Sequence, residues 1–312
     1  MNEYLQIGAK ALRSAALNDD AKHFILNNAK LYGILRKAAN RYIGGESLVE
    51  TLPKVIYANS EGYKCSIEFM GENVRTESEA DEATIEFINI VRHIENRNLD
   101  CTIALDLSHI GLGISRELGL KNLIQICDAA KRGGIEVIIS AEGTDMTDAV
   151  LETYITANKD FDLLGITLQA YLYRSRNDMQ ELLKTNGRIR IVKGAFETPP
   201  GYSIPRGSEL DAVYLSYVDD LLSHRHKCSI ATHHHDIQQH AKTMVDHYKP
   251  SKSNYEFESL YGIQSEQLLA LKEEGYMTKL YFVYGREWYL YLCNRIAEYP
   301  LNIFKLLEDI TL

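Results

Sequence analysis

The sequence predicts an α/β protein, a distorted (β/α)8 barrel of the TIM type with flanking helices at its N-terminus. Eight short runs rich in β-branched and apolar residues recur along the 312-residue chain, and their starts lie 24 to 39 residues apart. These intervals leave room for a crossover helix after each strand, and the segments between the strands have helical patterns of apolar residues. Eight parallel strands that alternate with helices favour a closed barrel, with a doubly wound open sheet as the alternative.

The eight expected strands are all short and mostly apolar. They cover 64–70, 101–107, 135–141, 163–169, 188–194, 227–233, 254–260 and 278–284. Three of the segments between them carry end signals typical of helices. Ser78 opens one segment with early acidic residues, and Ser175 opens another with Asp178 three residues later. Ser265 precedes an apolar stripe that ends before Gly275, the expected stop.

The residues before the first strand are expected to be helical throughout. Residues 1–24 form an amphipathic pattern without the apolar core of a signal peptide. We therefore divide the chain into an N-terminal helical segment, residues 1–60, that flanks the barrel, and a catalytic barrel of residues 61–312. No Pro/Ser-rich linker separates the two.

Composition excludes several classes of function. Lys and Arg number 34 against 43 Asp and Glu, a formal net charge of −9. Such a chain lacks the surplus of cations that binding to nucleic acid requires. No uncharged apolar run reaches the roughly 20 residues that span a bilayer, so we expect no integral membrane segment. The 5 cysteines are odd in number and scattered, which indicates a reduced, cytoplasmic protein.

The catalytic groups of such barrels lie where the strands end, and the sixth strand ends in a histidine cluster. The run ATHHHD, residues 231–236, could suggest a metal site, since imidazole is a common metal ligand. Adjacent residues of an extended segment point to opposite faces, so His233, His234 and His235 cannot all reach one ion. We expect no metal site, and a metal-dependent barrel hydrolase remains a minor alternative.

The fifth expected strand carries an unusual amount of positive charge. Arg188 and Arg190 share one face of this strand, while Lys193 lies on the other. A buried strand should not hold Arg190 unless the guanidinium meets an anion or a polar ring. The plainer interpretation is an ion pair with Glu197 or with a carboxylate on a neighbouring strand.

The last strand is followed by an aromatic helical pattern that ends in one Arg. Tyr291 and Arg295 are i,i+4 neighbours on this helix, and Glu298 follows Arg295 at i+3. An aromatic ring beside an Arg that a Glu holds in place suits the binding of a small carboxylate. A packed helix face with a surface ion pair is the alternative.

Six stretches of the sequence are similar, in order and spacing, to the motifs of one family. They are FMGENVRTESEA (69–80), LQAYLYRS (168–175), RIVKGAFE (190–197), ATHH (231–234), YEFESLYG (255–262) and the segment 273–302. The chain thereby resembles the flavin-dependent proline dehydrogenases, in particular the short monofunctional bacterial ones, from about residue 50 to 305. The resemblance implies a distorted (β/α)8 barrel that binds FAD without a covalent bond.

The resemblance also implies which residues surround the flavin and the substrate. Arg190 would reach the flavin N5, and Gln169 would contact the isoalloxazine edge. The implied cofactor contacts are Gln169, Arg190, Val192, Lys193, Gly194, Ala195, Thr232, His233 and Glu258. The residues implied on the substrate side are Asp106, Arg190, Leu260, Tyr281, Tyr291, Asn294, Arg295 and Glu298.

The chain departs from the family pattern on the substrate side. Asp106 stands where the family has a carboxylate-binding Lys, Asn294 replaces the first of two consecutive Arg, and Ser140 and His234 replace acidic residues. The first two changes alter the local charge by −2 and −1. A carboxylate about 4 Å from a unit charge feels roughly 4 kcal/mol at an effective dielectric of 20. Free proline is therefore expected to be a poor substrate.

The leading hypothesis is an FAD-dependent oxidoreductase acting on a proline-like or other small secondary amine. Its substrate would carry a masked carboxylate, for example as a thioester on a carrier protein, or a second cationic group facing Asp106. Alternatively, Asp106 points away and another cation substitutes for the missing Lys. Ordinary L-proline dehydrogenase, which forms Δ1-pyrroline-5-carboxylate, is the closest alternative, and a catalytically inactive barrel binding protein is the alternative from another class. The electron acceptor stays open, a quinone being one candidate, and so does a peripheral position at the inner membrane.

Overall fold

The computed structural model describes residues 3–16, 18–71, 74–298 and 302–311. Eight parallel strands form a closed barrel in sequence order, with β8 paired to β1. The strands are β1 Lys64–Phe69, β2 Cys101–Leu105, β3 Val137–Ile139, β4 Leu164–Gln169, β5 Ile189–Val192, β6 Cys228–Ala231, β7 Tyr255–Leu260 and β8 Thr278–Tyr284. All eight lie within the predicted runs, and the predicted barrel is confirmed.

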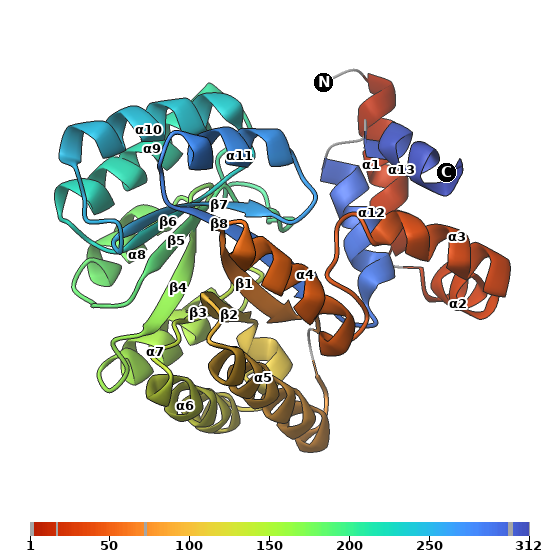
Figure 1. Ribbon diagram of the computed structural model, residues 1–312, viewed down its shortest axis with the longest axis horizontal. Coiled ribbons are helices and arrows are strands. Elements are labelled where there is room, and N and C mark those ends of the chain that lie inside the picture. Colours follow the sequence, from red (N-terminus) through yellow and green to blue (C-terminus); the bar gives the residue numbers. More distant parts are fainter. Residues whose placement is uncertain (1–2, 17, 72–73, 299–301, 312) are drawn as a thin grey trace.

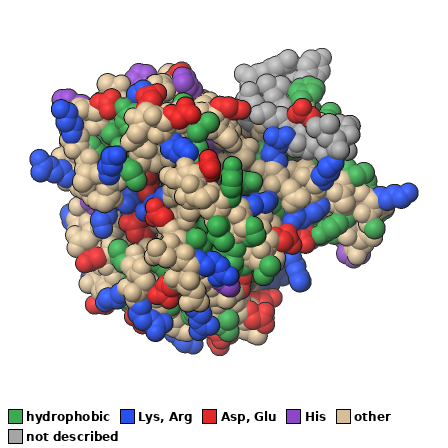
Figure 2. Space-filling model, viewed as in Figure 1, with side chains coloured by type: hydrophobic (Ala, Val, Ile, Leu, Met, Phe, Trp, Pro, Cys, Tyr) green, Lys and Arg blue, Asp and Glu red, His purple; other side chains and the backbone are tan. Residues whose placement is uncertain are grey.

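Helices surround the barrel and form a second lobe beside it (Figure 1). Four helices precede the first strand: α1 Glu3–Ala16, α2 Asp19–Asn27, α3 Ala29–Ala39 and α4 Leu48–Ser60. The helices that follow are α5 Glu77–Arg97, α6 Arg116–Arg132, α7 Thr147–Asn158, α8 Ser175–Leu182, α9 Ser208–Ser223, α10 His235–Tyr248, α11 Ser265–Glu273, α12 Trp288–Glu298 and α13 Asn302–Thr311. None of the described helices is long and apolar enough to cross a bilayer. Acidic and basic side chains are interspersed over the face shown in Figure 2.

The barrel is distorted because α4, and not the helix that follows the last strand, covers the outside of β1 and β8. α4 packs on β1 and β8, where the helix after the last strand would lie in a regular barrel. α12 instead joins α1, α3 and α13 in the second lobe (Figure 1). Its Trp288 and Leu292 belong to a buried cluster that includes Ala104 and Tyr281 of the barrel. α12 is therefore placed against the ends of β2 and β8, where its polar residues can contribute to a site.

The N-terminal helical pattern breaks into two helices. Residues 1–24 were expected to form one amphipathic helix, but α1 ends at Ala16 and α2 begins at Asp19. The Asn18 side chain caps α2 by accepting a hydrogen bond from the Ala21 N–H at 2.9 Å. An Asn at this position favours a new helix start over continuation.

Two predicted helix starts are also corrected. The cap of α5 is Thr76, two residues before Ser78, and its hydroxyl accepts from the Glu79 N–H at 3.3 Å. The Glu79 carboxylate accepts in turn from the Thr76 N–H at 3.0 Å, which completes a capping box. α8 does begin at Ser175, but this hydroxyl donates to the Gln169 carbonyl at 2.6 Å instead of capping the helix.

α11 begins at Ser265 without any side-chain cap, because the preceding Gln264 adopts the left-handed conformation. Its end is as predicted. Gly275 follows the helix with a φ of 91°, which favours glycine.

A buried ionic network closes the N-terminal end of the barrel. Glu136 pairs with Lys64 and Arg188, both at 3.0 Å. Glu256 lies 2.5 Å from the Lys279 ammonium and 3.6 Å from the Arg188 guanidinium. Burial alone would raise the pKa of Glu256, but Lys279, Arg188 and Lys64 together hold this pKa well below its ordinary value. The charges therefore satisfy one another and support the strands that carry the site above them.

Candidate active site

Arg190 occupies the centre of the barrel with every arm of its guanidinium engaged. Its Nε donates to Thr167 Oγ1 at 2.9 Å, and one terminal nitrogen donates to Ser140 Oγ at 3.2 Å. The other terminal nitrogen lies 3.4 Å from Glu258 Oε1. The guanidinium also stacks over the Tyr281 ring, 4.7 Å from its centroid. Residues of four strands thus fix one buried cation in a single orientation.

Glu258 links Arg190 to the network below it. Its second carboxylate oxygen lies 2.7 Å from the ammonium of Lys279, whose side chain is fully buried. The plainer interpretation of Arg190 was an ion pair with Glu197 or with a carboxylate on a neighbouring strand. The structure instead pairs Arg190 with Glu258 of β7, which β6 separates from β5. Sequence reasoning missed Lys279, although a lone Lys inside the apolar strand 278–284 was a readable signal.

Ser140 connects three charged or polar groups at the end of β3. Its hydroxyl bonds to Arg190, to Glu68 Oε2 at 3.4 Å and to the Tyr281 hydroxyl at 3.3 Å. A hydroxyl can donate to one partner and accept from another. An acidic residue at this position would instead place a second carboxylate beside Glu68. The sequence showed Ser140 only as a departure, and its contacts depend on the register of four strands.

The expected group on α12 is brought together as its helical spacing predicts. Arg295 pairs with Glu298 at 2.5 Å, and its guanidinium lies 5.0 Å from the centroid of the Tyr291 ring. The Tyr291 hydroxyl and Arg295 Nε are buried without a hydrogen-bond partner among the described residues. Burial raises the pKa of Tyr291, so the hydroxyl keeps its proton and can donate. These two groups can donate hydrogen bonds to a polar ligand such as a carboxylate.

The histidines at the end of β6 diverge as expected. His233 Nε2 accepts a hydrogen bond from the Leu260 N–H at 3.0 Å. Burial, together with the positive charge of Arg295, lowers the pKa of His233 to about 4, so this ring is neutral near pH 7. His234 is exposed and lies 3.8 Å from Asp211, while His235 begins α10. No group of potential metal ligands occurs in the described ranges.

The ends of β4 and β5 form a cradle that fits a flat ligand. Gln169 donates to the Glu142 carbonyl at 3.0 Å, while its buried Oε1 has no partner in the described structure. Gly194 has a φ of 108°, and a Cβ there would meet the Tyr171 ring at 2.2 Å. Lys193 pairs with Asp211 at 2.5 Å. Gly194 thus lets the Tyr171 ring pack directly on the backbone. The unpaired amide oxygen of Gln169 fits a polar edge of a flavin, in agreement with the resemblance.

Gly194→Ala is expected to lower the free energy of unfolding by about 1 to 3 kcal/mol, because the added Cβ strains the backbone and displaces Tyr171. Chemical denaturation measures this loss. Gly201→Ala is the matched control, since Gly201 also has a positive φ but has open space around its Cβ position. Equal losses in the two variants would show that the Tyr171 contact is unimportant.

The remaining sequence-predicted residues lie at the same end of the barrel. Asp106 directly follows β2 and is half-buried, and Asn294 is half-buried on α12. Val192 ends β5, Ala195 follows it in an exposed loop, and Thr232 follows β6 with its hydroxyl accepting from the His234 N–H at 3.1 Å. The structure therefore groups the predicted cofactor and substrate residues around one mouth.

Comparison with known proteins identifies the same family. The family model described as proline dehydrogenase matches residues 52–299. Proline dehydrogenase 1 of Bacillus subtilis subsp. natto is 32% identical over 282 residues, covering 90% of this chain and 93% of that protein. Proline dehydrogenase of Deinococcus radiodurans is 30% identical over 269 residues, covering 85% of this chain and 87% of that protein.

Solved structures show the same fold. Proline utilization A from Bdellovibrio bacteriovorus, inactivated by N-propargylglycine, superposes with a TM-score of 0.81 at 19% identity, over 94% of this chain. A variant of proline utilization A from Bradyrhizobium japonicum superposes with a TM-score of 0.66 at 20% identity, over 87% of this chain. This chain spans only 37% and 33% of those two proteins. From the family model and the Bacillus relative, the chain belongs to the proline dehydrogenase family, a family of oxidoreductases that act on CH–NH donors.

Proposed function

We propose that this protein is an FAD-dependent oxidoreductase that oxidises the C–N bond of a proline-like or other small secondary amine. The observation that carries the proposal is Arg190, a buried cation fixed by Thr167, Ser140 and Glu258. FAD, when bound, supplies N5 as the hydride acceptor. A preorganised cation at the reacting centre stabilises the negative charge that the hydride brings, without reorganisation during the reaction.

The chain's own residues would bind and orient the amine. Leu260 and Tyr291 provide an apolar and an aromatic wall, and Arg295 offers a guanidinium that Glu298 holds in place. Tyr281 lies under the Arg190 guanidinium and bonds to Ser140, so its ring is fixed from two sides. Arg190 and Tyr281 are nearly inaccessible to solvent, which strengthens each electrostatic contact.

The substrate is proposed to differ from free L-proline. Asp106 and Asn294 replace two cations of the family pattern, and Arg295 is already paired with Glu298. A free carboxylate would therefore be held weakly. A masked carboxylate, such as a thioester on a carrier protein, or a second cationic group avoids this cost. The alternative is ordinary L-proline dehydrogenase, which requires another cation to replace the family Lys.

The visible absorption spectrum of the purified protein tests the cofactor and the class of function together. We expect a flavin spectrum that L-prolinamide or a prolyl thioester bleaches under anaerobic conditions. A colourless protein that gains no flavin absorbance on incubation with FAD would instead favour the inactive binding protein.

Two classes of electron acceptor could reoxidise the reduced flavin. A soluble acceptor fits a cytoplasmic enzyme, while a quinone would require a position at the surface of the inner membrane. Reoxidation of the bleached flavin by a soluble quinone analogue or by detergent-dispersed quinone distinguishes them.

A further inference from the structure

The chain has a single tryptophan, and it lies at the start of the helix that carries the substrate-side residues. Trp288 is the first residue of α12. It is 1% exposed, and its ring meets the Tyr32 ring of α3 edge-on, with the two centroids 5.6 Å apart. Tyr291 and Arg295 follow Trp288 at i+3 and i+7, which places all three on one face of the helix. The position of Trp288 therefore sets the position of the two side chains that the proposed function assigns to the substrate.

A carboxylate from outside the helix holds the indole N–H of Trp288. Glu46, in the segment between α3 and α4, accepts this hydrogen bond through Oε1 at 2.6 Å. The same oxygen accepts from the Tyr32 hydroxyl and lies 3.3 Å from Arg36 Nε. The bond to Glu46, followed by burial, raises the pKa of Tyr32, so this hydroxyl keeps its proton and donates. One carboxylate oxygen thus joins α3 to the start of α12.

The backbone before Glu46 is fixed to the barrel. The Gly44 N–H donates to the Val283 carbonyl at 2.7 Å, and the Gly285 N–H donates to the Gly45 carbonyl at 3.1 Å. The two glycines therefore run beside the end of β8, and Glu46 is the next residue along the chain. Its carboxylate consequently has little freedom to move relative to the barrel.

A second contact at the start of α12 is weaker. Glu287, directly before the helix, pairs with Lys22 of α2 at 2.5 Å. Both side chains are partly exposed, and ion pairs of this kind contribute little because water competes for the charges. Trp288 instead belongs to a buried apolar cluster, where an indole N–H without an acceptor is costly. Glu46 is therefore the principal support of this end of α12.

The face of α12 that carries Trp288 reaches the end of the barrel that holds the proposed active site. Burial, and then the positive charge of Arg295, lower the pKa of His233 to about 4, so the guanidinium lies near the end of β6. Burial above all raises the pKa of Tyr291, with a smaller contribution from Glu68 of β1. A tilt of α12 about its start would move both side chains away from these strands.

We propose that Glu46 is a positioning residue for the substrate, which holds the start of α12 so that Tyr291 and Arg295 reach the barrel mouth. The inference rests on the proposed function, because that function assigns these two residues to the amine substrate. Glu46 makes no hydrogen bond or ion pair with either of them in the described part of the chain. Its loss should therefore weaken substrate binding and leave Arg190, the cation proposed to act at the flavin, undisturbed.

Anaerobic flavin reduction by L-prolinamide in the flavin-loaded full chain tests this effect. In Glu46→Leu, which removes the acceptor, we expect the half-saturating concentration to rise about tenfold, the effect of losing one buried hydrogen bond to a charged group. The limiting rate of reduction and the flavin potential should equal those of the parent, since Arg190 keeps its partners. Glu46→Gln should recover most of the affinity, because its amide oxygen still accepts from the indole N–H.

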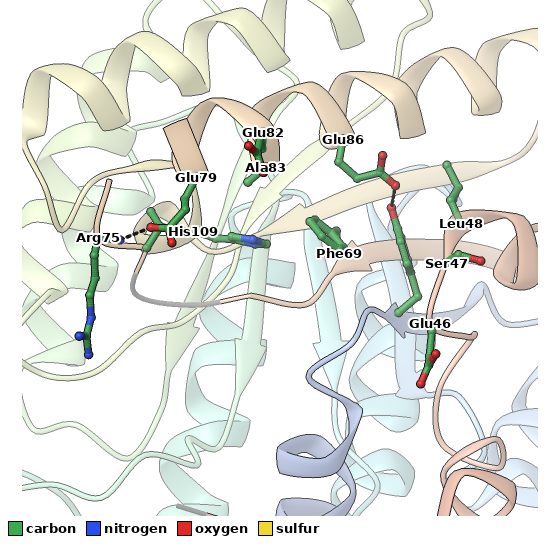
Figure 3. Close-up of a pocket in the computed structure, with 12 residues that line it drawn as sticks. Glu46, Ser47, Leu48, Phe69, Arg75, Glu79, Glu82, Ala83, Glu86 and His109 are labelled. Carbon is green, nitrogen blue, oxygen red and sulfur yellow. Dashed lines mark hydrogen bonds between the residues drawn. The ribbon is translucent and has the colours of Figure 1, made fainter. Parts of the chain in front are cut away.

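Glu86→Leu is the matched control. Glu86 and Glu46 line the same pocket (Figure 3), and the Glu86 carboxylate also accepts from an aromatic side chain, the Tyr284 hydroxyl, at 2.5 Å. Glu86 makes no hydrogen bond or ion pair with α12 within the described ranges. Its loss should lower the melting temperature without changing the half-saturating concentration. Equal weakening of substrate binding by Glu46→Leu and Glu86→Leu would indicate a general loss of stability and overturn the proposal.

Acrylamide quenching of Trp288 fluorescence tests the position of α12 without any substrate. Because the chain has no other tryptophan, all tryptophan emission comes from this residue. In Glu46→Leu we expect a red-shifted emission maximum and stronger quenching than in the parent and in Glu86→Leu. Unchanged quenching or an unchanged half-saturating concentration in Glu46→Leu would overturn the proposal. A parent flavin that L-prolinamide does not bleach would contradict the proposed function instead, and the quenching comparison would still decide on the role of Glu46.

Discussion

Arg190→Met is expected to slow flavin reduction by about a hundredfold or more, because losing a preorganised charged donor at a reacting centre costs about 3 kcal/mol. The flavin potential should also become more negative, since the cation that stabilises the reduced ring is gone. Anaerobic stopped-flow reduction and a redox titration measure the two effects. Folding should survive, because Glu258 keeps Lys279 as its partner at 2.7 Å.

Arg190→Lys separates charge from geometry. This variant retains a cation but loses the planar fork that reaches Ser140, Thr167 and Glu258 together. We expect a reduction rate between those of the parent and Arg190→Met, with a potential close to that of the parent. Reduction of Arg190→Met at the parent rate would show that Arg190 does not act at the flavin.

Lys279→Met is expected to lower the free energy of unfolding by about 3 to 5 kcal/mol, because it leaves buried carboxylates without a counter-charge. Lys279 is fully buried and lies 2.5 Å from Glu256 and 2.7 Å from Glu258. Urea denaturation followed by circular dichroism measures the loss. Adding Glu256→Gln to this variant should recover part of the stability.

Lys242→Met is the control for this prediction. Lys242 pairs with Glu274, but both side chains are partly exposed, so its removal should cost no more than about 1 kcal/mol. Similar losses for Lys242→Met and Lys279→Met would mean that the buried network contributes nothing beyond a surface ion pair.

The strands were predictable because each buried run is short, apolar and spaced by a helix-length interval. The positions of α4 and α12 were not predictable from the sequence. Both segments have helical patterns, and only tertiary packing decides which of the two covers β1 and β8. The predicted start of α5 at Ser78 was wrong, although the local pattern Thr76-x-x-Glu79 is that of a capping box and indicates Thr76 as the cap.

The site likewise has one part that local spacing predicts and another that only the strand register brings together. Tyr291, Arg295 and Glu298 share one helix face, so their grouping followed from spacing alone. The contacts among Glu68, Ser140, Tyr281 and Arg190 join four strands, and no local pattern contains the register that brings them together.

We propose that the substrate side of this site does not suit a free carboxylate. Anaerobic flavin bleaching by L-proline and by L-prolinamide tests it most directly, in the parent and in the double variant Asp106→Lys with Asn294→Arg. We expect L-proline to reduce the flavin of the parent slowly and with weak saturation, and L-prolinamide to reduce it faster. The double variant, whose local charge is higher by +3, should reverse this preference. Rapid, tight reduction of the parent by free L-proline would contradict the proposed change of substrate and identify an ordinary L-proline dehydrogenase.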